Sequence, residues 1–231
     1  MDVIWNLTRA CPWDCAICCV SGYHVCNTTE HLVYSEAKEK GEELTLAEKL
    51  TVLKILADRG FEIDFSGGDP LYYDEDFQVV EQDTRWLPSR KIGVSMKWEL
   101  LRFYPVGRGI KLAELTPSNS EYLKTMKFLR GLHGFTKIFF QHSLRILEGA
   151  IKCPAVVDSI GILPDGIVTA CAWAIDDNCR PYPEFRLGKL PEDDLDEILE
   201  NALKIPEYCK RTNFCRAIAH VQKVTRGGKV I

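Results

Sequence analysis

Apolar and polar positions in the first 66 residues predict a strand, a loop, a helix and a second strand. Val3 to Leu7 form an apolar, largely β-branched run, which predicts a strand that stops at Thr8. The capping box Thr45–Glu48 predicts the start of a helix, and Gly60 is placed to end it. Phe61 to Phe65 alternate as in a strand, so we expect a βαβ unit with a right-handed parallel crossover. The apolar positions that recur at helical spacing in between are Leu46, Leu50, Leu53 and Leu56.

The pattern further along the chain predicts short strands and one more amphipathic helix. Residues 118–131 predict a helix with Ser118 or Asn119 as its cap and Gly131 as its stop. Its expected buried stripe is Tyr122, Met126 and Leu129. The turn Pro164-Asp165-Gly166 joins two short β runs and predicts a hairpin. The remaining strands are expected at Lys91–Met96, Lys137–Gln141, Ser159–Leu163 and Ile167–Ala170.

The composition of the 231-residue chain limits what kind of protein it encodes. With 46% hydrophobic residues it can build one medium domain and a small appendage. No apolar run reaches the ~18 residues of a membrane span, and the formal charge of −4 gives no electrostatic case for nucleic acid. Ten cysteines without an export signal favour metal or cluster ligation over disulfides. We therefore expect a cytoplasmic, oxygen-sensitive protein with neither membrane nor nucleic acid as a partner.

Three cysteines follow the first strand on one short loop. Cys11, Cys15 and Cys18 have the spacing C-x3-C-x2-C. Three thiolates can hold three corners of a [4Fe–4S] cube and leave the fourth iron open to a substrate or cofactor. A structural zinc site is the alternative, but zinc favours paired C-x2-C knuckles and four ligands, which the x3 gap and the adjacent Cys18-Cys19 fit poorly. A disulfide framework is disfavoured because nothing at the N-terminus resembles a secretion signal.

This loop, placed directly after a first strand, resembles the cluster loop of the radical S-adenosylmethionine (radical SAM) enzymes. The resemblance implies that the open iron chelates the amino and carboxylate groups of SAM. One electron from the cluster would then cleave the sulfonium and release a 5′-deoxyadenosyl radical, which abstracts hydrogen from a substrate. The family usually has an aromatic residue before the third cysteine, whereas this chain has Ile17, which we expect to pack over the cluster equally well.

The second predicted strand leads into Ser66-Gly67-Gly68-Asp69-Pro70. Two glycines at that place let a backbone come close to a ligand, although such a sequence alone is usually only a turn. Downstream of this cysteine loop it resembles the family's glycine-rich "GGE" motif, which binds the ammonium of SAM. The resemblance assigns Gly67, Gly68, Asp69 and Pro70 to SAM binding. Because Asp69 replaces the usual glutamate, we expect backbone carbonyls to be the main acceptors.

Residues 100–109 resemble a late strand and loop of the same family's barrel. Within them, Arg108 either binds a carboxylate or phosphate bidentately or is an exposed loop arginine. Only 34 residues lie between Pro70 and Pro105, whereas a single strand–helix–strand unit takes about 30. Either the barrel is abbreviated, or residues near Lys97-Trp98 are missing from the sequence. An intact mass of 26.3 kDa would refute the second explanation.

A second cysteine group occupies the last third of the chain. Cys153 and Cys171 bracket the predicted hairpin in the pattern C-x12-G-x4-C, so hairpin closure would bring them near one another. The pattern resembles the opening of the SPASM and shorter twitch extensions that follow many radical SAM barrels. The run Phe185–Leu190 and the acidic-started helix after it are similar to the same extension. The resemblance implies one auxiliary [4Fe–4S] cluster, with the ligands Cys153, Cys171, Cys209 and Cys215, and Cys179 as an alternate.

This second group departs from the full SPASM pattern. A full segment has C-x2-C-x5-C-x3-C, whereas this chain has only the C-x5-C portion at Cys209 and Cys215. We therefore expect a twitch-like single cluster that carries electrons and binds no substrate. A zinc ribbon is the structural alternative.

Some other residues of chemical interest have no assigned role. His24, Cys26 and His31 match no common metal spacing, so we expect a lid or surface role for them, and Cys19 is unassigned. Tyr23 and Tyr104 are pocket candidates, as is Arg108. His142 either approaches the active site or is a hydrogen-bonded structural histidine, and we expect the second; we expect Met126 to be core.

The sequence as a whole predicts an α/β protein. We expect a partial (β/α)6, TIM-like barrel over residues 1–149, followed by a hairpin-and-helix extension with the auxiliary cluster over residues 150–231. Barrel active sites lie at the carboxyl ends of the strands, where both the cysteine loop and Gly67–Asp69 are placed.

The resemblance implies an enzyme that modifies a ribosomal peptide by a crosslink, a thioether or an epimerisation. A radical SAM dehydrogenase for a small molecule is the nearest alternative, and a non-catalytic zinc- or cluster-binding scaffold is the other. We expect no leader-peptide-binding domain before residue 1, so the preference for a peptide is small. An electron donor such as flavodoxin or ferredoxin is the expected partner.

Overall fold

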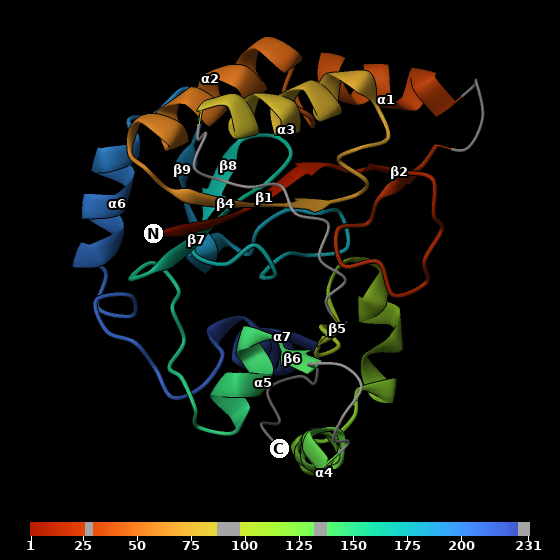
Figure 1. Cartoon of the computed structure of the whole chain (residues 1–231), viewed down its shortest axis with the longest axis vertical. Coiled ribbons are helices and arrows are strands. Elements are labelled where there is room, and N and C mark those ends of the chain that lie inside the picture. The colour runs from red at the N-terminus through yellow and green to blue at the C-terminus, as the bar shows by residue number, and fades with distance from the viewer. Residues whose placement is uncertain (26–29, 87–97, 132–137, 226–231) are drawn as a thin grey trace.

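A five-stranded mixed sheet stands at the centre of the computed structural model, which describes residues 1–25, 30–86, 98–131 and 138–225. The strand order is β4-β1-β7-β8-β9, with β4 and β7 both parallel to β1 and the last two pairs antiparallel (Figure 1). These strands are β1 Asp2–Thr8, β4 Glu62–Gly67, β7 Ser159–Ile162, β8 Ile167–Thr169 and β9 Arg186–Lys189.

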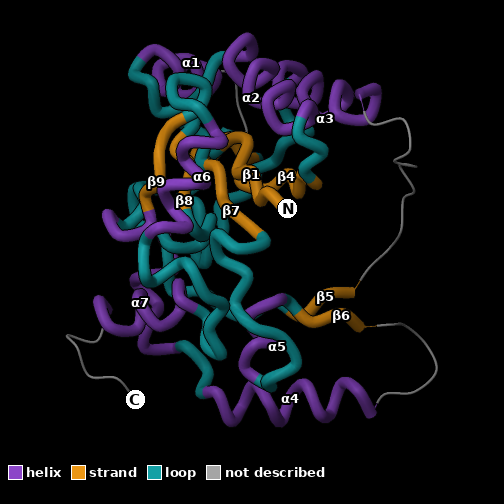
Figure 2. Tube along the Cα trace, turned by 90° about the vertical axis from the view of Figure 1, so that its left-hand side faces the viewer, coloured by secondary structure: helices purple, strands orange, loops and turns teal. Residues whose placement is uncertain are grey.

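Helices α1, α2 and α3 cover one face of this sheet, and the remaining elements lie beyond the other face or at its edge (Figures 1 and 2). The helices are α1 Glu30–Glu39, α2 Leu46–Asp58, α3 Asp74–Trp86, α4 Asn119–Gly131, α5 His142–Leu147, α6 Leu195–Lys204 and α7 Arg216–Thr225, with 3-10 helices at Gly107–Leu115 and Pro183–Phe185. Two short parallel pairs complete the list of elements: β2 Ala10–Cys11 with β3 Tyr23–His24, and β5 Trp98–Leu100 with β6 Ile138–Phe140.

The predicted βαβ unit is confirmed as β1–α2–β4. The Thr45 hydroxyl accepts from the Glu48 backbone N–H while the Glu48 carboxylate accepts from the Thr45 N–H, so the expected capping box starts α2. Trp5 pairs with Phe65 across the two parallel strands. The helix-facing side of β1 is fully buried against α2 because its alternate residues are large and apolar. The core they form contains Val3, Trp5, Leu7, Val52, Leu53 and Leu56.

The other face of the same strands is polar. Asn6 and Thr8 on β1 are fully buried, and Asp64 and Ser66 on β4 border a cavity. A strand places alternate residues on opposite faces, so this polar side follows directly from the residues between the apolar ones. The cavity lies between this face and α5.

The hairpin that opens the predicted extension is confirmed, but it joins the central sheet. Gly166 has a φ of +84° at the turn between β7 and β8. Strand β7 then runs parallel to β1, so strands from residues 1–149 and 150–231 form one sheet. No barrel closes among the described residues, and the partial (β/α)6 barrel stays a prediction. The predicted strand at Lys91–Met96, like Lys97, lies outside the described residues.

The predictions for the middle of the chain hold in part. Helix α4 has the expected bounds, Ser118 forms a capping box with Glu121, and Met126 is core. The expected buried strand over residues 137–141 is β6 at its described positions, and it is half-buried because it pairs only with β5.

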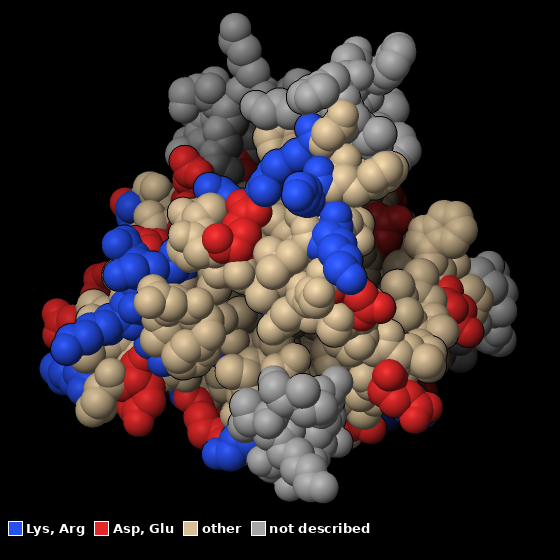
Figure 3. Space-filling view, turned by 90° about the horizontal axis from the view of Figure 1, so that it is seen from below, with Lys and Arg blue, Asp and Glu red and all other residues tan. Residues whose placement is uncertain are grey.

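Among the described residues, no helix is both long and apolar enough to cross a bilayer. Acidic and basic side chains are interspersed on the face seen in Figure 3. That face therefore carries charges of both signs side by side.

Candidate functional site

The ends of β1 and β4 bring the first cysteine loop and the glycine motif into direct contact. The Gly68 N–H donates to the Thr8 carbonyl at 2.7 Å, and the Asp69 N–H donates to the Ala10 carbonyl at 2.8 Å. A Cβ on Gly68 would lie 2.2 Å from the Ala10 oxygen, and Gly67 has a φ of +109°. The two glycines are therefore required by the close approach of the two backbones, a cause that the sequence alone did not suggest.

The three cysteines of this loop lie around one turn. The Cys18 N–H donates to the Cys15 carbonyl at 3.1 Å, and the Gly22 N–H donates to the Cys18 Sγ at 3.2 Å. A Cβ on Gly22 would meet both Cys11 Cβ and Cys18 Sγ at 3.6 Å. Burial raises the pKa of the Cys11 thiol, and the charges of Cys18, Asp69 and Cys15 raise it further. The thiols thus lie near enough to oppose one another's ionisation, which a bound cationic metal centre would reverse.

The loop at residues 104–109 also docks on the cysteine loop. The Arg108 N–H donates to the Cys18 carbonyl at 3.0 Å, and a Cβ on Gly107 would lie 2.4 Å from the Cys19 oxygen. The Arg108 guanidinium pairs with Asp14, while its Nε and Nη2 atoms are buried without a hydrogen-bond partner among the described residues. Arg108 is therefore a half-buried cation whose guanidinium lies against both Asp14 and the Cys18 thiol, beside the predicted cluster.

A buried ionic network contacts the start of the cysteine loop at Arg9. The Arg9 N–H donates to Glu43 Oε1 at 2.6 Å, and the Lys49 Nζ lies 3.6 Å from Glu43 Oε2. Lys49 also donates to Asp76 at 2.6 Å and to the Tyr34 hydroxyl at 3.2 Å. Burial raises the pKa of Glu43 to about 7 against the lowering effects of Lys49 and Arg9. No sequence motif marked this network, because its members are far apart in the chain.

Tyr23 has a structural role beside this network. Its hydroxyl accepts from Arg9 Nη1 at 2.9 Å and donates to Glu42 at 3.0 Å, and the Arg9 guanidinium stacks on its ring. His24 is exposed next to it in β3. Cys26 and the side chain of His31 lie outside the described residues, so their predicted role is untested.

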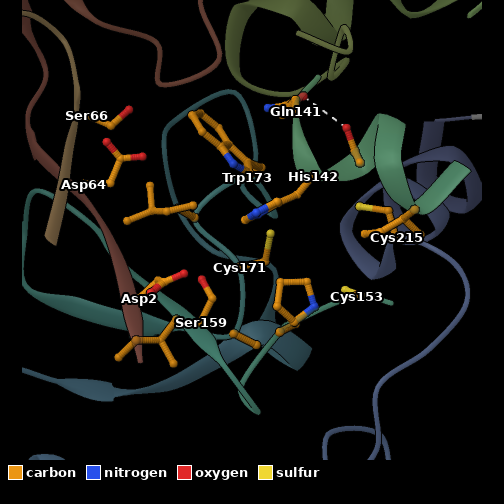
Figure 4. Close-up of a pocket in the computed structure, with 18 of the residues that line it drawn as sticks. Asp2, Asp64, Ser66, Gln141, His142, Cys153, Ser159, Cys171, Trp173 and Cys215 are labelled. Atoms are coloured by element: carbon orange, nitrogen blue, oxygen red, sulfur yellow. Dashed lines mark hydrogen bonds between the residues drawn. The ribbon is translucent and has the colours of Figure 1, made fainter. Parts of the chain in front are cut away.

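The second cysteine group gathers around the cavity. Cys153, Cys171 and Cys215 all line this cavity of about 630 Å³. Burial raises the pKa of Cys171, and Cys215 and Cys153 raise it further. Figure 4 shows the three cysteines on one side of the cavity, with Asp64 and Ser66 across from them. Hairpin closure therefore brings Cys153 and Cys171 together as predicted, and the start of α7 adds Cys215.

The other two predicted auxiliary ligands lie elsewhere. Cys209 is exposed, and its thiol donates to the Pro206 carbonyl at 3.3 Å. Cys179 is buried, and burial raises its pKa to about 12 while Cys19 and Glu43 lie near enough to add to this effect. Neither of them lines the cavity.

Several other residues line the same cavity. Tyr104, a pocket candidate, is buried with its hydroxyl 3.8 Å from the Cys215 Sγ, and its ring lies 5.9 Å from that of Trp173. Gln141 and His142 line the cavity from the end of β6 and the start of α5. Trp173 lies two residues after Cys171, a position that no motif singled out.

Among the described residues, no three histidine, cysteine, aspartate or glutamate side chains lie close enough together to hold one metal ion. A [4Fe–4S] cube binds its ligands at separate iron corners, so they are spaced more widely than the four ligands of a zinc ion. The two groups of three thiols therefore stay predicted cluster ligands.

Comparison of the chain with protein-family models, with curated proteins and with solved structures finds no match. The functional assignment therefore rests on the residues and their geometry.

Proposed function

We propose that this chain is a radical SAM enzyme with one auxiliary cluster. The observation that carries the proposal is the backbone contact between the three-cysteine loop and Gly67–Asp69, at the carboxyl ends of two neighbouring parallel strands. In a barrel-like α/β protein this end of the strands is where active sites form. A cluster with one open iron on the first loop would lie directly beside the glycine motif.

Three groups of residues would bind the cluster and SAM. Cys11, Cys15 and Cys18 would hold the cluster, and the backbone carbonyls of Gly67–Pro70 would accept from the SAM ammonium. The Arg108 guanidinium, which lies against Asp14 and the Cys18 thiol, would supply charge-assisted donors to the SAM carboxylate. When bound, the cluster and SAM supply a one-electron reductive cleavage that yields an organic radical for hydrogen abstraction.

The cavity provides the place for a substrate and an acceptor of electrons. Its volume of about 630 Å³ lies within the range of about 300–1,000 Å³ that small-molecule pockets show. The same volume would hold one residue of a bound peptide. Cys153, Cys171 and Cys215 border it, so a cluster there would take up the electron left on the substrate after hydrogen abstraction. An electron donor such as flavodoxin or ferredoxin, in the cytoplasm, would supply the first cluster.

Reductive cleavage of SAM tests the proposal. The anaerobically prepared protein, given SAM and dithionite, should form 5′-deoxyadenosine, and Cys15→Ala should abolish this product. Cys209→Ala is the matched control, because its thiol is exposed and bonded to the Pro206 carbonyl, so cleavage should persist. A Cys15→Ala variant that still cleaves SAM at the wild-type rate contradicts the assignment.

A second assay separates the two substrate classes. Peptide maturation requires that a peptide encoded beside this gene be added before any new product forms. Product formation from a small polyol or amino alcohol without any peptide would instead favour the dehydrogenase alternative.

A further inference from the structure

The second cysteine group has three thiols at the cavity where four protein ligands are expected. Cys153, Cys171 and Cys215 line the cavity, and Cys209 does not. The Cys209 thiol is exposed and donates to the Pro206 carbonyl, in the turn after α6. Using Cys209 as the fourth ligand would therefore require the chain between α6 and α7 to move.

One histidine side chain is present at the same cavity. His142 lines the cavity together with the three cysteines, and Figure 4 shows its side chain in the same part of the cavity as Cys171 and Cys215. His142 is a solvent-exposed residue. Among the described residues it makes no hydrogen bond and no ion pair, contrary to the expectation of a hydrogen-bonded structural histidine.

The backbone that carries His142 is fixed on both sides. The Gln141 N–H donates to the Leu100 carbonyl at 3.1 Å, and Gln141 Oε1 accepts from the Arg102 N–H at 2.9 Å. The buried Ser143 hydroxyl donates to the same Gln141 oxygen at 3.0 Å (Figure 4). Gln141 and Ser143, whose side chains hydrogen-bond to each other, thus fix the backbone on both sides of His142 at the cavity wall.

We infer that His142 is the fourth protein ligand of the auxiliary cluster, in place of Cys209. The inference rests on the proposed function, because it needs a cluster at Cys153, Cys171 and Cys215. Histidine nitrogen is an established ligand of iron–sulfur clusters, and a neutral imidazole adds one negative charge less than a thiolate. A cluster held by three thiolates and one imidazole therefore has a higher reduction potential than one held by four thiolates, which suits an acceptor of the substrate's electron.

The test uses the full chain carrying Cys11→Ala, Cys15→Ala and Cys18→Ala, so that only the auxiliary cluster contributes to the spectrum. The protein is labelled with 15N-histidine, reconstituted anaerobically with iron and sulfide, reduced, and measured by pulsed EPR. We expect about four irons per chain and a strongly coupled histidine nitrogen. That coupling should disappear in His142→Ala and persist in Cys209→Ser and in His220→Gln.

Each other outcome has a distinct meaning. A cluster without coupled histidine nitrogen, or one whose coupling survives His142→Ala, overturns the ligand assignment and leaves the proposed function standing. Loss of the cluster in Cys209→Ser also overturns it. A reconstituted protein without any iron in this background contradicts the auxiliary cluster itself, and with it that part of the proposed function.

A conservative replacement gives an independent readout. His142→Cys supplies a thiolate at the same place, so it should retain about four irons and shift the midpoint potential of the cluster to a more negative value. An unchanged potential in His142→Cys would show that residue 142 does not bind the cluster.

Discussion

At the scale of single residues, Gly68 allows the cysteine loop and the glycine motif to approach each other closely. Gly68 has no room for a side chain, because its Cβ would lie 2.2 Å from the Ala10 carbonyl oxygen. Gly68→Ala should therefore lower the free energy of unfolding by about 1–3 kcal/mol, as overpacking does, and reduce the iron bound at the first site. Urea unfolding and iron analysis measure the two effects.

Gly131 is the control for this substitution. It ends α4, and a Cβ there would meet nothing within 4 Å. Gly131→Ala should leave the iron content unchanged and the unfolding free energy unchanged within about 0.5 kcal/mol. Equal effects of the two substitutions would show that the contact between Gly68 and Ala10 is not tight.

The buried carboxylate behind the loop makes stability depend on pH. Burial raises the pKa of Glu43 from 4.5 to about 7, so the folded chain keeps this proton at a pH where the unfolded chain has lost it. The contribution of Glu43 to the free energy of unfolding therefore falls as pH rises from 4.5 to about 7. Removing the carboxylate in Glu43→Gln should make the variant gain stability relative to wild type over this range, measured by urea unfolding.

Glu48 gives a control of opposite sign. Its hydrogen bonds with Thr45 lower the pKa of its carboxyl, so its stabilising effect is present above the unfolded pKa and is lost as pH falls. Glu48→Gln should therefore lose stability relative to wild type as pH rises from the acid range. If the stability of both variants relative to wild type changes in the same direction as pH rises, the Glu43 carboxyl does not have a raised pKa.

At the scale of elements, the β7–β8 turn is placed by a backbone contact. Gly166 has a φ of +84° and its Cβ would lie 2.1 Å from the Leu190 oxygen, whereas Gly149 has a φ of +79° with nothing within 4 Å. Both alanine variants carry the cost of the left-handed conformation, about 1–2 kcal/mol. Gly166→Ala should cost about 1–3 kcal/mol more, because only it also meets a clash. Urea unfolding compares them, and equal losses would contradict the packing of this turn against Leu190.

Local signals predicted the elements well. The Thr45–Glu48 capping box, the Pro164-Asp165-Gly166 turn and the cap at Ser118 are contacts within a few residues, so a sequence can reveal them. The partners of the elements depend on contacts between distant residues. The pairing of β7 with β1, and the absence of Cys209 from the residues that line the cavity, could not be predicted for that reason.

At the scale of the whole molecule, the two predicted domains share one sheet and one core. Strand β1 pairs with β7, and Trp5 belongs to the same core cluster as Ile160 and Ile162. Residues 1–149 produced alone should therefore lack a cooperative urea transition and near-ultraviolet circular dichroism, because β1 keeps β4 but loses its second partner β7 and part of its core. The full chain is the control. A fragment that unfolds cooperatively would show two independent domains.

The most direct measurement is the EPR spectrum of the dithionite-reduced protein before and after addition of SAM. We predict a [4Fe–4S] signal that changes on addition of SAM, because the proposed cluster would have one open iron corner beside Gly67–Asp69. This SAM-dependent change should be absent from Cys15→Ala, which would retain only the signal of the auxiliary cluster. A protein that takes up no iron at this loop, or whose signal does not respond to SAM, would contradict the radical SAM assignment.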